Sequence, residues 1–307
     1  MKRIIQKSCT TIIRDPDIVK FRGQYYLCYA TANKSQAGIC ISCADSVDDF
    51  DLSHNNFVYT AEQGKPWSHE LWAPELHFID GSWYIYVACD DGNNDNHRMY
   101  VLANHSDNPM DPYTLEGKIT DPTDKWAIDG NILHHNGKMY FIWSGWEGDV
   151  NIAQNIYIAE MKNPYELSSA RVLISKPDQP WEKIGGTGTI GGLPFINEGP
   201  FAFHTNGNIY IAYSGSGSWC ESYCIALLKL VGDNPLNPDH WQKGNQPILS
   251  ENELVKGAGH CSIVTEDDGT LLIFFHAWEK EEQKLQWNTV GTFCGTLIFT
   301  GEDATII

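Results

Sequence analysis

A glycine-centred turn flanked by two strand-like segments recurs five times along the chain. The turn glycines are Gly23, Gly81, Gly137, Gly207 and Gly269, at spacings of 58, 56, 70 and 62 residues. Asp or Asn precedes four of them, and these pairs favour type I′ hairpin turns because both central residues need positive φ. The repeat therefore predicts an all-β fold, a five-bladed β-propeller with four-stranded blades, since a two-sheet sandwich has no reason to repeat at this interval.

The five units account for nearly the whole chain of 307 residues. The expected blades span residues 12–60, 68–120, 126–176, 194–248 and 256–303. We therefore expect a single catalytic domain over residues 1–307, without an appended carbohydrate-binding module. A soluble oligosaccharide is then a better expected substrate than an insoluble polymer.

The charge of the chain narrows the classes of partner. With 21 Lys and Arg against 39 Asp and Glu, the net charge is −18, which disfavours nucleic acid because phosphates need clustered cations. The longest apolar run, residues 83–89, has seven residues, whereas a membrane-spanning helix needs about 20. The N-terminus lacks the apolar stretch of a signal peptide, and nine scattered cysteines fit a reducing compartment. We expect a cytoplasmic protein with a neutral ligand and neither a membrane nor a nucleic-acid partner.

Ionisable side chains stand just before each of the five hairpins. They are Asp15, Glu75, Asp129, Glu198 and His260, six to nine residues ahead of their turn glycine. In a propeller the innermost strands all start at the same end of the axis, so these side chains are expected to meet there. Crowded carboxyl groups push pKa values apart, which yields the acid and the base that cleavage of a glycosidic bond requires.

The segments that carry these side chains resemble glycoside hydrolase family 43. They read Arg14-Asp15-Pro16-Asp17, Trp72-Ala73-Pro74-Glu75, Ile128-Asp129-Gly130, Asn197-Glu198-Gly199-Pro200 and Gly257-Ala258-Gly259-His260. The resemblance implies a five-bladed propeller that hydrolyses arabinose- and xylose-containing glycans with inversion. It implies that Asp15 is the general base and Glu198 the general acid. Asp129 is then the third carboxyl group, which orients the acid and keeps its pKa high.

Further side chains are candidates for contact with the sugar. Trp72, Trp143, Trp146 and Trp219 lie at strand ends or in nearby loops, where they either stack on a sugar face or pack between blades. Glu75 and His260 are the other candidates. For His260 the resemblance also implies a place beside an axial cation such as calcium, and a buried core histidine is the third possibility. No cofactor is expected for the chemistry itself.

Segments 96–101 and 143–149 are most similar to the exo-acting α-L-arabinofuranosidases of the family. The leading hypothesis is an inverting hydrolase that releases terminal α-L-arabinofuranose from arabino-oligosaccharides or arabinan side chains. Two alternatives stay open at this point, a β-xylosidase of the same family and a sugar-binding propeller without catalytic activity.

Overall fold

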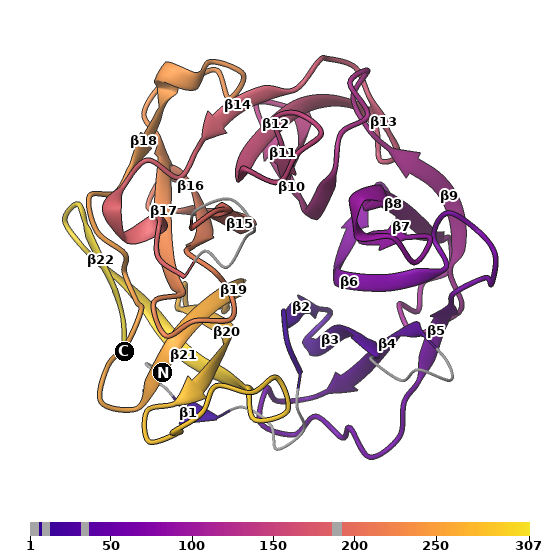
Figure 1. Cartoon of the computed structure of the whole chain (residues 1–307). Coiled ribbons are helices and arrows are strands. Elements are labelled where there is room, and N and C mark those ends of the chain that lie inside the picture. The colour runs from indigo at the N-terminus through magenta and orange to yellow at the C-terminus, as the bar shows by residue number, and fades with distance from the viewer. Residues whose placement is uncertain (1–5, 8–12, 32–36, 186–191) are drawn as a thin grey trace.

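The computed structural model describes residues 6–7, 13–31, 37–185 and 192–307, and strands dominate it (Figure 1). The expected start of the first blade, residue 12, lies outside these residues. The first two sheets have four strands each, in the orders β2-β3-β4-β5 and β6-β7-β8-β9. Their bounds are β2 Asp17–Phe21, β3 Gln24–Thr31, β4 Gly38–Ala44, β5 Phe57–Thr60, β6 His69–Ile79, β7 Ser82–Asp90, β8 Arg98–Asn104 and β9 Thr114–Ile119.

The middle of the chain forms one nine-stranded sheet rather than two separate ones. Its two halves are joined by a short parallel pairing in which Ala153 and Gln154 of β12 lie opposite Phe195 and Ile196 of β15. Their bounds are β10 Ala127–His135, β11 Lys138–Trp146, β12 Ala153–Asn163, β13 Glu166–Leu167, β14 Val172–Ser175, β15 Phe195–Thr205, β16 Asn208–Gly215, β17 Cys224–Leu230 and β18 Trp241–Lys243.

The last sheet combines the two ends of the described chain. It contains β19 Val255–Thr265, β20 Leu271–Glu279, β21 Gly291–Thr300, β22 Asp303–Ile306 and the N-terminal strand β1 Gln6–Lys7. Gln6 and Lys7 pair antiparallel with Cys294 and Phe293 of β21. Helices in the described residues are three 3₁₀ turns, η1 Asn94–Asn96, η2 Pro180–Glu182 and η3 Pro238–His240, so the all-β prediction is confirmed. None of these helices has the length and apolar character needed to span a membrane.

Each predicted hairpin joins an innermost strand to the next strand outward, and the turn chemistry explains four of the five. Positive φ angles occur at both central residues of Arg22-Gly23, Asp80-Gly81, Asn136-Gly137 and Asn206-Gly207. The fifth turn is longer, because Glu266 N donates to Thr270 O across it and Asp268 keeps an ordinary backbone conformation. The residue before the turn glycine is thus left-handed at Arg22 and not at Asp268. The sequence favours the opposite, because Asp adopts positive φ more readily than Arg.

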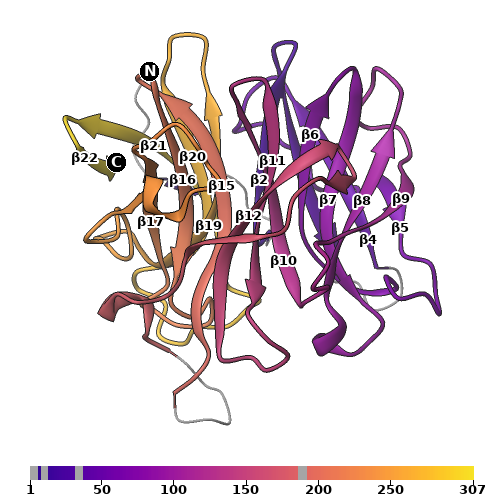
Figure 2. The same cartoon turned by 90° about the horizontal axis from the view of Figure 1, so that it is seen from above.

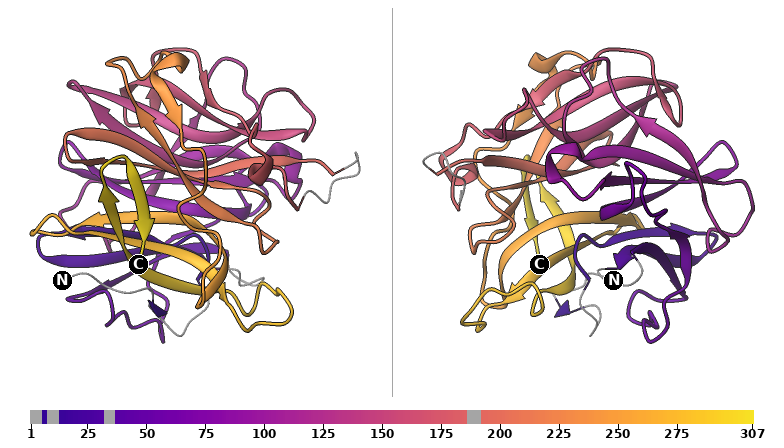
Figure 3. Two further views of the ribbon diagram at one scale, coloured as in Figure 1. Left: turned by 90° about the vertical axis from the view of Figure 1, so that its left-hand side faces the viewer. Right: turned by 45° about the vertical axis from the view of Figure 1, so that its right-hand side comes forward.

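The strand groups surround a common centre, with β2, β6, β10, β15 and β19 nearest to it (Figure 1). Figure 2, turned by 90°, shows these inner strands running along the central direction. Five hydrophobic clusters fill the interfaces between consecutive strand groups. In the fifth cluster, Leu272 and Phe274 of the last sheet pack against Ile18 and Leu27 of the first. The side views of Figure 3 show the last sheet beside these first strands.

Polar links between neighbouring groups tie the inner strands together near the centre. They are Leu76 N to Asp17 Oδ2 (2.7 Å), Asn131 Nδ2 to Glu75 Oε2, Ala202 N to Asn131 Oδ1 (2.9 Å), His260 N to Ser214 Oγ (2.7 Å) and Ile18 N to Ser262 Oγ (3.2 Å). Four of these five links satisfy a backbone N–H of an inner strand with a side chain from a neighbouring group, and the link between Asn131 and Glu75 joins two side chains. Together they fix the positions of the inner strands relative to one another.

Candidate functional site

A left-handed residue within or just before each inner strand builds the site. Positive φ angles occur at Asp15, Ala73, Asp129 and Gly199, each eight residues before its turn glycine, and at His260, nine before. Irregular pairing accompanies them in β6, β10, β15 and β19. Such bulges re-aim side chains, and strained backbone of this kind clusters at functional sites. Three of the five residues, Asp15, Asp129 and His260, are ionisable and meet at this level.

Direct contacts join these side chains. His260 Nδ1 lies 3.3 Å from Asp15 Oδ1 and 4.0 Å from Asp129 Oδ2. Gly199 N donates to Asp129 Oδ2 at 2.9 Å, so Asp129 holds the backbone directly after Glu198. Asp129 and Glu198 are buried, 3% and 7% exposed, whereas the Asp15 side chain keeps 19% of its surface exposed. The structure therefore places Asp15, Asp129 and His260 in contact and holds the backbone beside Glu198 against Asp129, and the roles of these residues stay predictions.

The surroundings separate the protonation behaviour of the three carboxyl groups. Burial raises the pKa of Glu198 to about 7, and the charge of Asp15 adds to this rise. Burial and the charges of Glu198 and Asp15 also raise the pKa of Asp129. Burial alone acts in the same direction on Asp15, but the charges of His260 and Arg14 and a hydrogen bond to His276 outweigh it and lower its pKa. Near pH 7 Asp15 is therefore ionised, whereas about half of the Glu198 carboxyl groups carry a proton.

Glu75 belongs to a second layer of buried polar groups, which corrects its expected place beside Glu198. It stands six residues before its turn glycine, as Asp17 and Asn131 do, and so lies one side-chain repeat further along its strand. Its Oε2 accepts a hydrogen bond from Asn131 and lies 3.5 Å from His77 Nε2. Burial raises the pKa of Glu75 to about 8 and that of Asp17 to about 7, and lowers that of His77 to about 4.

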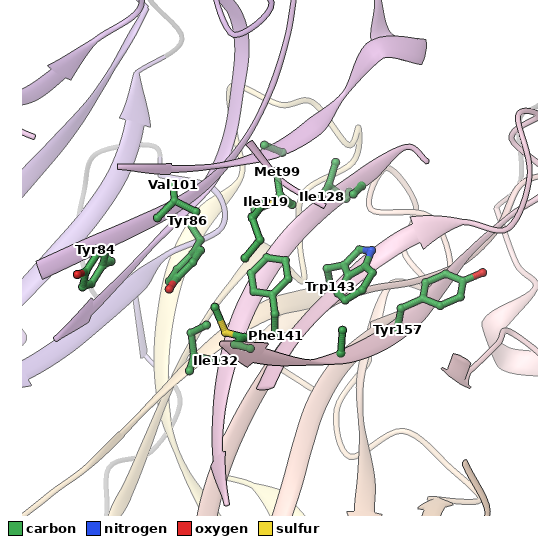
Figure 4. Packing of buried hydrophobic residues seen from close by; sticks show 14 of the residues in the cluster. Tyr84, Tyr86, Met99, Val101, Ile119, Ile128, Ile132, Phe141, Trp143 and Tyr157 are labelled. Atoms are coloured by element: carbon green, nitrogen blue, oxygen red, sulfur yellow. The ribbon is translucent and has the colours of Figure 1, made fainter. Parts of the chain in front are cut away.

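Two of the four candidate tryptophans are core residues, which corrects their expected sugar contact. Trp143 is 4% exposed and stacks between Phe141 and Tyr157, as Figure 4 shows, at centroid distances of 5.5 and 5.9 Å. Trp146 is 3% exposed and stacks on Trp126 at 4.8 Å. Both rings are covered by protein on their faces, so packing between strand groups, the alternative stated from the sequence, describes them.

Trp72 and Trp219 remain partly exposed. Trp72 stacks on the imidazole of His97 at 4.0 Å, and its Nε1 donates to Glu70 Oε2 at 2.9 Å. Trp219 lies in the loop between β16 and β17, where its Nε1 donates to Gly185 O. A sugar contact for either ring stays a prediction.

Sequence reasoning missed two side chains that touch the carboxyl groups and a third whose charge acts on them. Tyr223 OH donates to Glu198 Oε1 at 2.9 Å. His276 Nδ1 lies 3.1 Å from Asp15 Oδ1 and 3.2 Å from Asp15 N. Arg14 places its guanidinium 3.8 Å above the centre of the Trp287 ring, and its charge lowers the pKa of both Asp15 and Glu198. His276 lies opposite Gly259 in the fifth hairpin, and this register with the Gly-His motif is the signal that marks it.

The donor set near His260 does not match a calcium cage. Calcium prefers six to eight oxygen ligands, and the described residues contain no group of three or more His, Cys, Asp or Glu side chains that could hold a metal ion. Burial lowers the pKa of His260 to about 4, so its imidazole is neutral near pH 7. We derive no chemical step through a cation, and the axial calcium stays a prediction.

Neighbouring carboxyl groups with separated pKa values form the kind of site on which glycosidases depend. The chain belongs to the glycosyl hydrolases family 43, whose model matches residues 9–293.

Curated relatives match most of this chain. An alpha-L-arabinofuranosidase 43 from Humicola insolens is 32% identical over 83% of this chain and 52% of the relative. An extracellular exo-alpha-(1->5)-L-arabinofuranosidase from Streptomyces chartreusis is 28% identical over 87% of this chain and 80% of the relative. The chain thus spans about half the length of the first of these relatives.

Among solved structures, an alpha-L-arabinofuranosidase from Lactobacillus brevis superimposes with a TM-score of 0.82. The two chains are 28% identical, and the match covers 99% of this chain and 94% of the other. A thermostable family-43 glycoside hydrolase follows at a TM-score of 0.79 and 23% identity, which shows likeness of fold.

Proposed function

We propose that the protein is an inverting glycosidase that releases terminal α-L-arabinofuranose from arabino-oligosaccharides or arabinan side chains. The observation that carries this proposal is the separation of pKa values between two neighbouring carboxyl groups, lowered at Asp15 and raised to about 7 at Glu198. Relatives at 28–32% identity are named arabinofuranosidases, which favours arabinose over xylose and makes a β-xylosidase the less supported alternative.

The chemistry assigns one role to each carboxyl group. Ionised Asp15 accepts a proton from water while the water oxygen bonds to the anomeric carbon, and protonated Glu198 donates its proton to the leaving oxygen as the glycosidic bond breaks. Inversion follows because water attacks from the face opposite the leaving group. Asp129 holds Gly199 N and thereby the backbone beside the acid. Afterwards Asp15 returns its proton to solvent and Glu198 is reprotonated.

We assign the fold as a five-bladed β-propeller, with β10–β14 and β15–β18 as separate blades of the nine-stranded sheet. Five hairpins and five hydrophobic clusters between consecutive strand groups support this count. The polar links between inner strands support closure of the ring. The cytoplasmic location also stays a proposal, and relatives from Streptomyces carry the word extracellular in their names.

Hydrolysis of p-nitrophenyl α-L-arabinofuranoside and of linear arabino-oligosaccharides tests the activity. We expect arabinose as the sole early product, with the β-anomer first in ¹H NMR, and a fall in kcat/KM above about pH 7 as Glu198 loses its proton. Glu198→Gln is expected to lower kcat on oligosaccharides by about 10²–10⁴-fold.

The controls separate the alternatives. A higher kcat/KM on the matching β-xyloside establishes the xylosidase instead. Release of the α-anomer contradicts inversion. Equal binding by wild type and Glu198→Gln without turnover by either establishes a sugar-binding propeller.

A further inference from the structure

Tyr223 connects the acid to a part of the site that no sequence motif marks. It is completely buried, directly before β17, and its hydroxyl donates to Glu198 Oε1 at 2.9 Å. Burial and the charges of Glu198 and Asp15 raise the pKa of Tyr223 well above its usual value, so the hydroxyl keeps its proton and acts as a donor.

The ring of Tyr223 also stacks on the imidazole of His276. Their centroids lie 5.4 Å apart with an angle of 14° between the planes, and His276 is fully buried. His276 Nδ1 in turn contacts Asp15, at 3.1 Å from Oδ1 and 3.2 Å from N. With its proton on Nδ1 the imidazole donates to the carboxylate, and with its proton on Nε2 it accepts from the backbone N–H. Two stacked rings therefore join Glu198 to Asp15.

Local backbone makes room for this pair. Gly259 lies opposite His276 in the pairing of β19 and β20, and a Cβ atom at position 259 would overlap the Tyr223 ring. The glycine that the sequence places directly before His260 thus has a steric reason that the motif alone does not give. The backbone of β19 therefore leaves room for the Tyr223 ring only because residue 259 is glycine.

We propose that Tyr223 is a positioning residue that couples the acid to the base: its hydroxyl orients Glu198, and its ring holds His276 against Asp15. This inference rests on the proposed function for its kinetic consequences. Because the Tyr223 hydroxyl donates to Glu198, we expect its removal to change kcat and the pH profile of kcat and to leave KM unchanged.

Several other groups surround Glu198 and Asp15, and a change at Tyr223 must leave them in place. Asp15 and Arg14 approach from the segment before β2, Asp129 from β10, His260 from β19 and His276 from β20. Ser218 adds a hydrogen bond from the loop before β17. On the other side of β15, Glu182 and Lys243 contact Asn197. Loss of the Tyr223 hydroxyl leaves all of these in place and removes one donor that lowers the pKa of Glu198.

Tyr223→Phe is the direct test because it keeps the ring and removes the hydroxyl. We expect the alkaline limb of the kcat profile to move up by about one pH unit, since hydrogen bonds to charged groups are worth about that much in pKa. We expect kcat on arabino-oligosaccharides to fall by about tenfold. On the p-nitrophenyl substrate we expect a smaller fall in kcat, because its leaving group needs little proton transfer. KM is expected to stay the same for both substrates.

Tyr213→Phe provides a matched control. Tyr213 is also fully buried and donates to a carboxylate, Glu182 Oε1, at the same 2.9 Å. Its loss tests the stability cost of removing such a bond, and the pH profile is expected to stay unchanged. An unmoved alkaline limb in Tyr223→Phe, or an equal shift in Tyr213→Phe, overturns the proposal.

A second readout needs no turnover. The carboxyl ¹³C resonance of Glu198, assigned with Glu198→Gln, reports its pKa in the folded protein, and we expect a higher value in Tyr223→Phe. This titration separates the coupling from the proposed function, because it holds or fails even if no arabinoside is cleaved. If Tyr223→Phe does not fold, 3-fluorotyrosine at position 223 keeps the ring and the hydroxyl but makes the hydroxyl a stronger donor to Glu198. We then expect a lower Glu198 pKa, and an unmoved pKa overturns the proposal.

Discussion

Asp15 and Glu198 both carry a carboxyl group, but their surroundings shift the pKa values of these groups in opposite directions. Asp15 is the more exposed of the two and lies beside His260, His276 and the charge of Arg14, which together lower its pKa. Glu198 is buried, and burial raises its pKa to about 7. The separation of the two pKa values creates a base and an acid at one pH, as general acid and base catalysis requires.

A prediction at the residue scale concerns Glu75 of the second layer. Its pKa rises from 4.5 to about 8 on folding, so the folded state binds the proton more tightly. Stability is then highest below about pH 4.5 and declines as the pH rises toward 8, by at most about 1.4 kcal/mol per pH unit from this group. Glu75→Gln keeps an acceptor for Asn131 and removes the charge. We expect a flatter pH dependence of the free energy of unfolding and a more stable variant at pH 8.

Denaturant unfolding at pH 5, 6.5 and 8 measures this effect. Lys138→Gln serves as a surface control, because its ion pair with Glu160 is exposed and is expected to change the pH slope very little. An identical slope for Glu75→Gln and wild type contradicts the prediction.

The hairpin elements explain which parts of the site the sequence predicts. Asp15, Asp129, Glu198 and His260 lie on or directly before inner strands, so their distance from a turn glycine places them at one level. The sequence places Glu75 in the wrong layer, because a residue six positions before the turn glycine lies one side-chain repeat further along the strand than a residue eight positions before it. Tyr223 comes from the loop before β17, where no motif accompanies it. His276 comes from β20, where only its register with the Gly-His motif marks it. Their roles depend on packing between groups, which one sequence does not specify.

A prediction at the element scale separates core tryptophans from exposed ones. Trp143 of β11 is 4% exposed and stacks on two neighbouring rings. Trp143→Ala is expected to destabilise the fold by about 3–5 kcal/mol, as large core deletions do, with KM unchanged in the folded fraction. Trp219→Ala in the partly exposed loop is expected to show the reverse pattern, a small loss of stability and a higher KM for arabino-oligosaccharides.

Thermal unfolding together with initial rates on an oligosaccharide series measures both quantities for each variant. A raised KM in a stably folded Trp143→Ala variant would show that Trp143 contacts the sugar. An unchanged KM in Trp219→Ala would show that Trp219 does not.

At the scale of the whole molecule, several contacts hold the first and last strand groups to each other. Phe274 and Leu272 pack on Ile18 and Leu27 in a shared cluster. Ile18 N donates to Ser262 Oγ at 3.2 Å, and Thr292 Oγ1 donates to Ile13 O at 2.9 Å. The sequence predicted the repeats, but it did not predict these contacts, because they join residues more than 240 positions apart.

The last prediction follows from this contact between first and last groups. Phe274 is completely buried in the cluster between them, and Phe141 is 1% exposed in a cluster between groups in the middle of the chain. If the groups form a ring, neither position is terminal, and Phe274→Ala and Phe141→Ala should each cost about 3–5 kcal/mol. Both variants should unfold in one cooperative transition, because each group keeps a neighbour on both sides.

Hydrogen exchange compares the two interfaces directly. In Phe274→Ala, protection in β2 and β3 is expected to fall no further than protection in β10 and β11 falls in Phe141→Ala. Separate early unfolding of the first sheet in Phe274→Ala, with the rest of the molecule still protected, is the result expected of an open row of sheets and contradicts the ring.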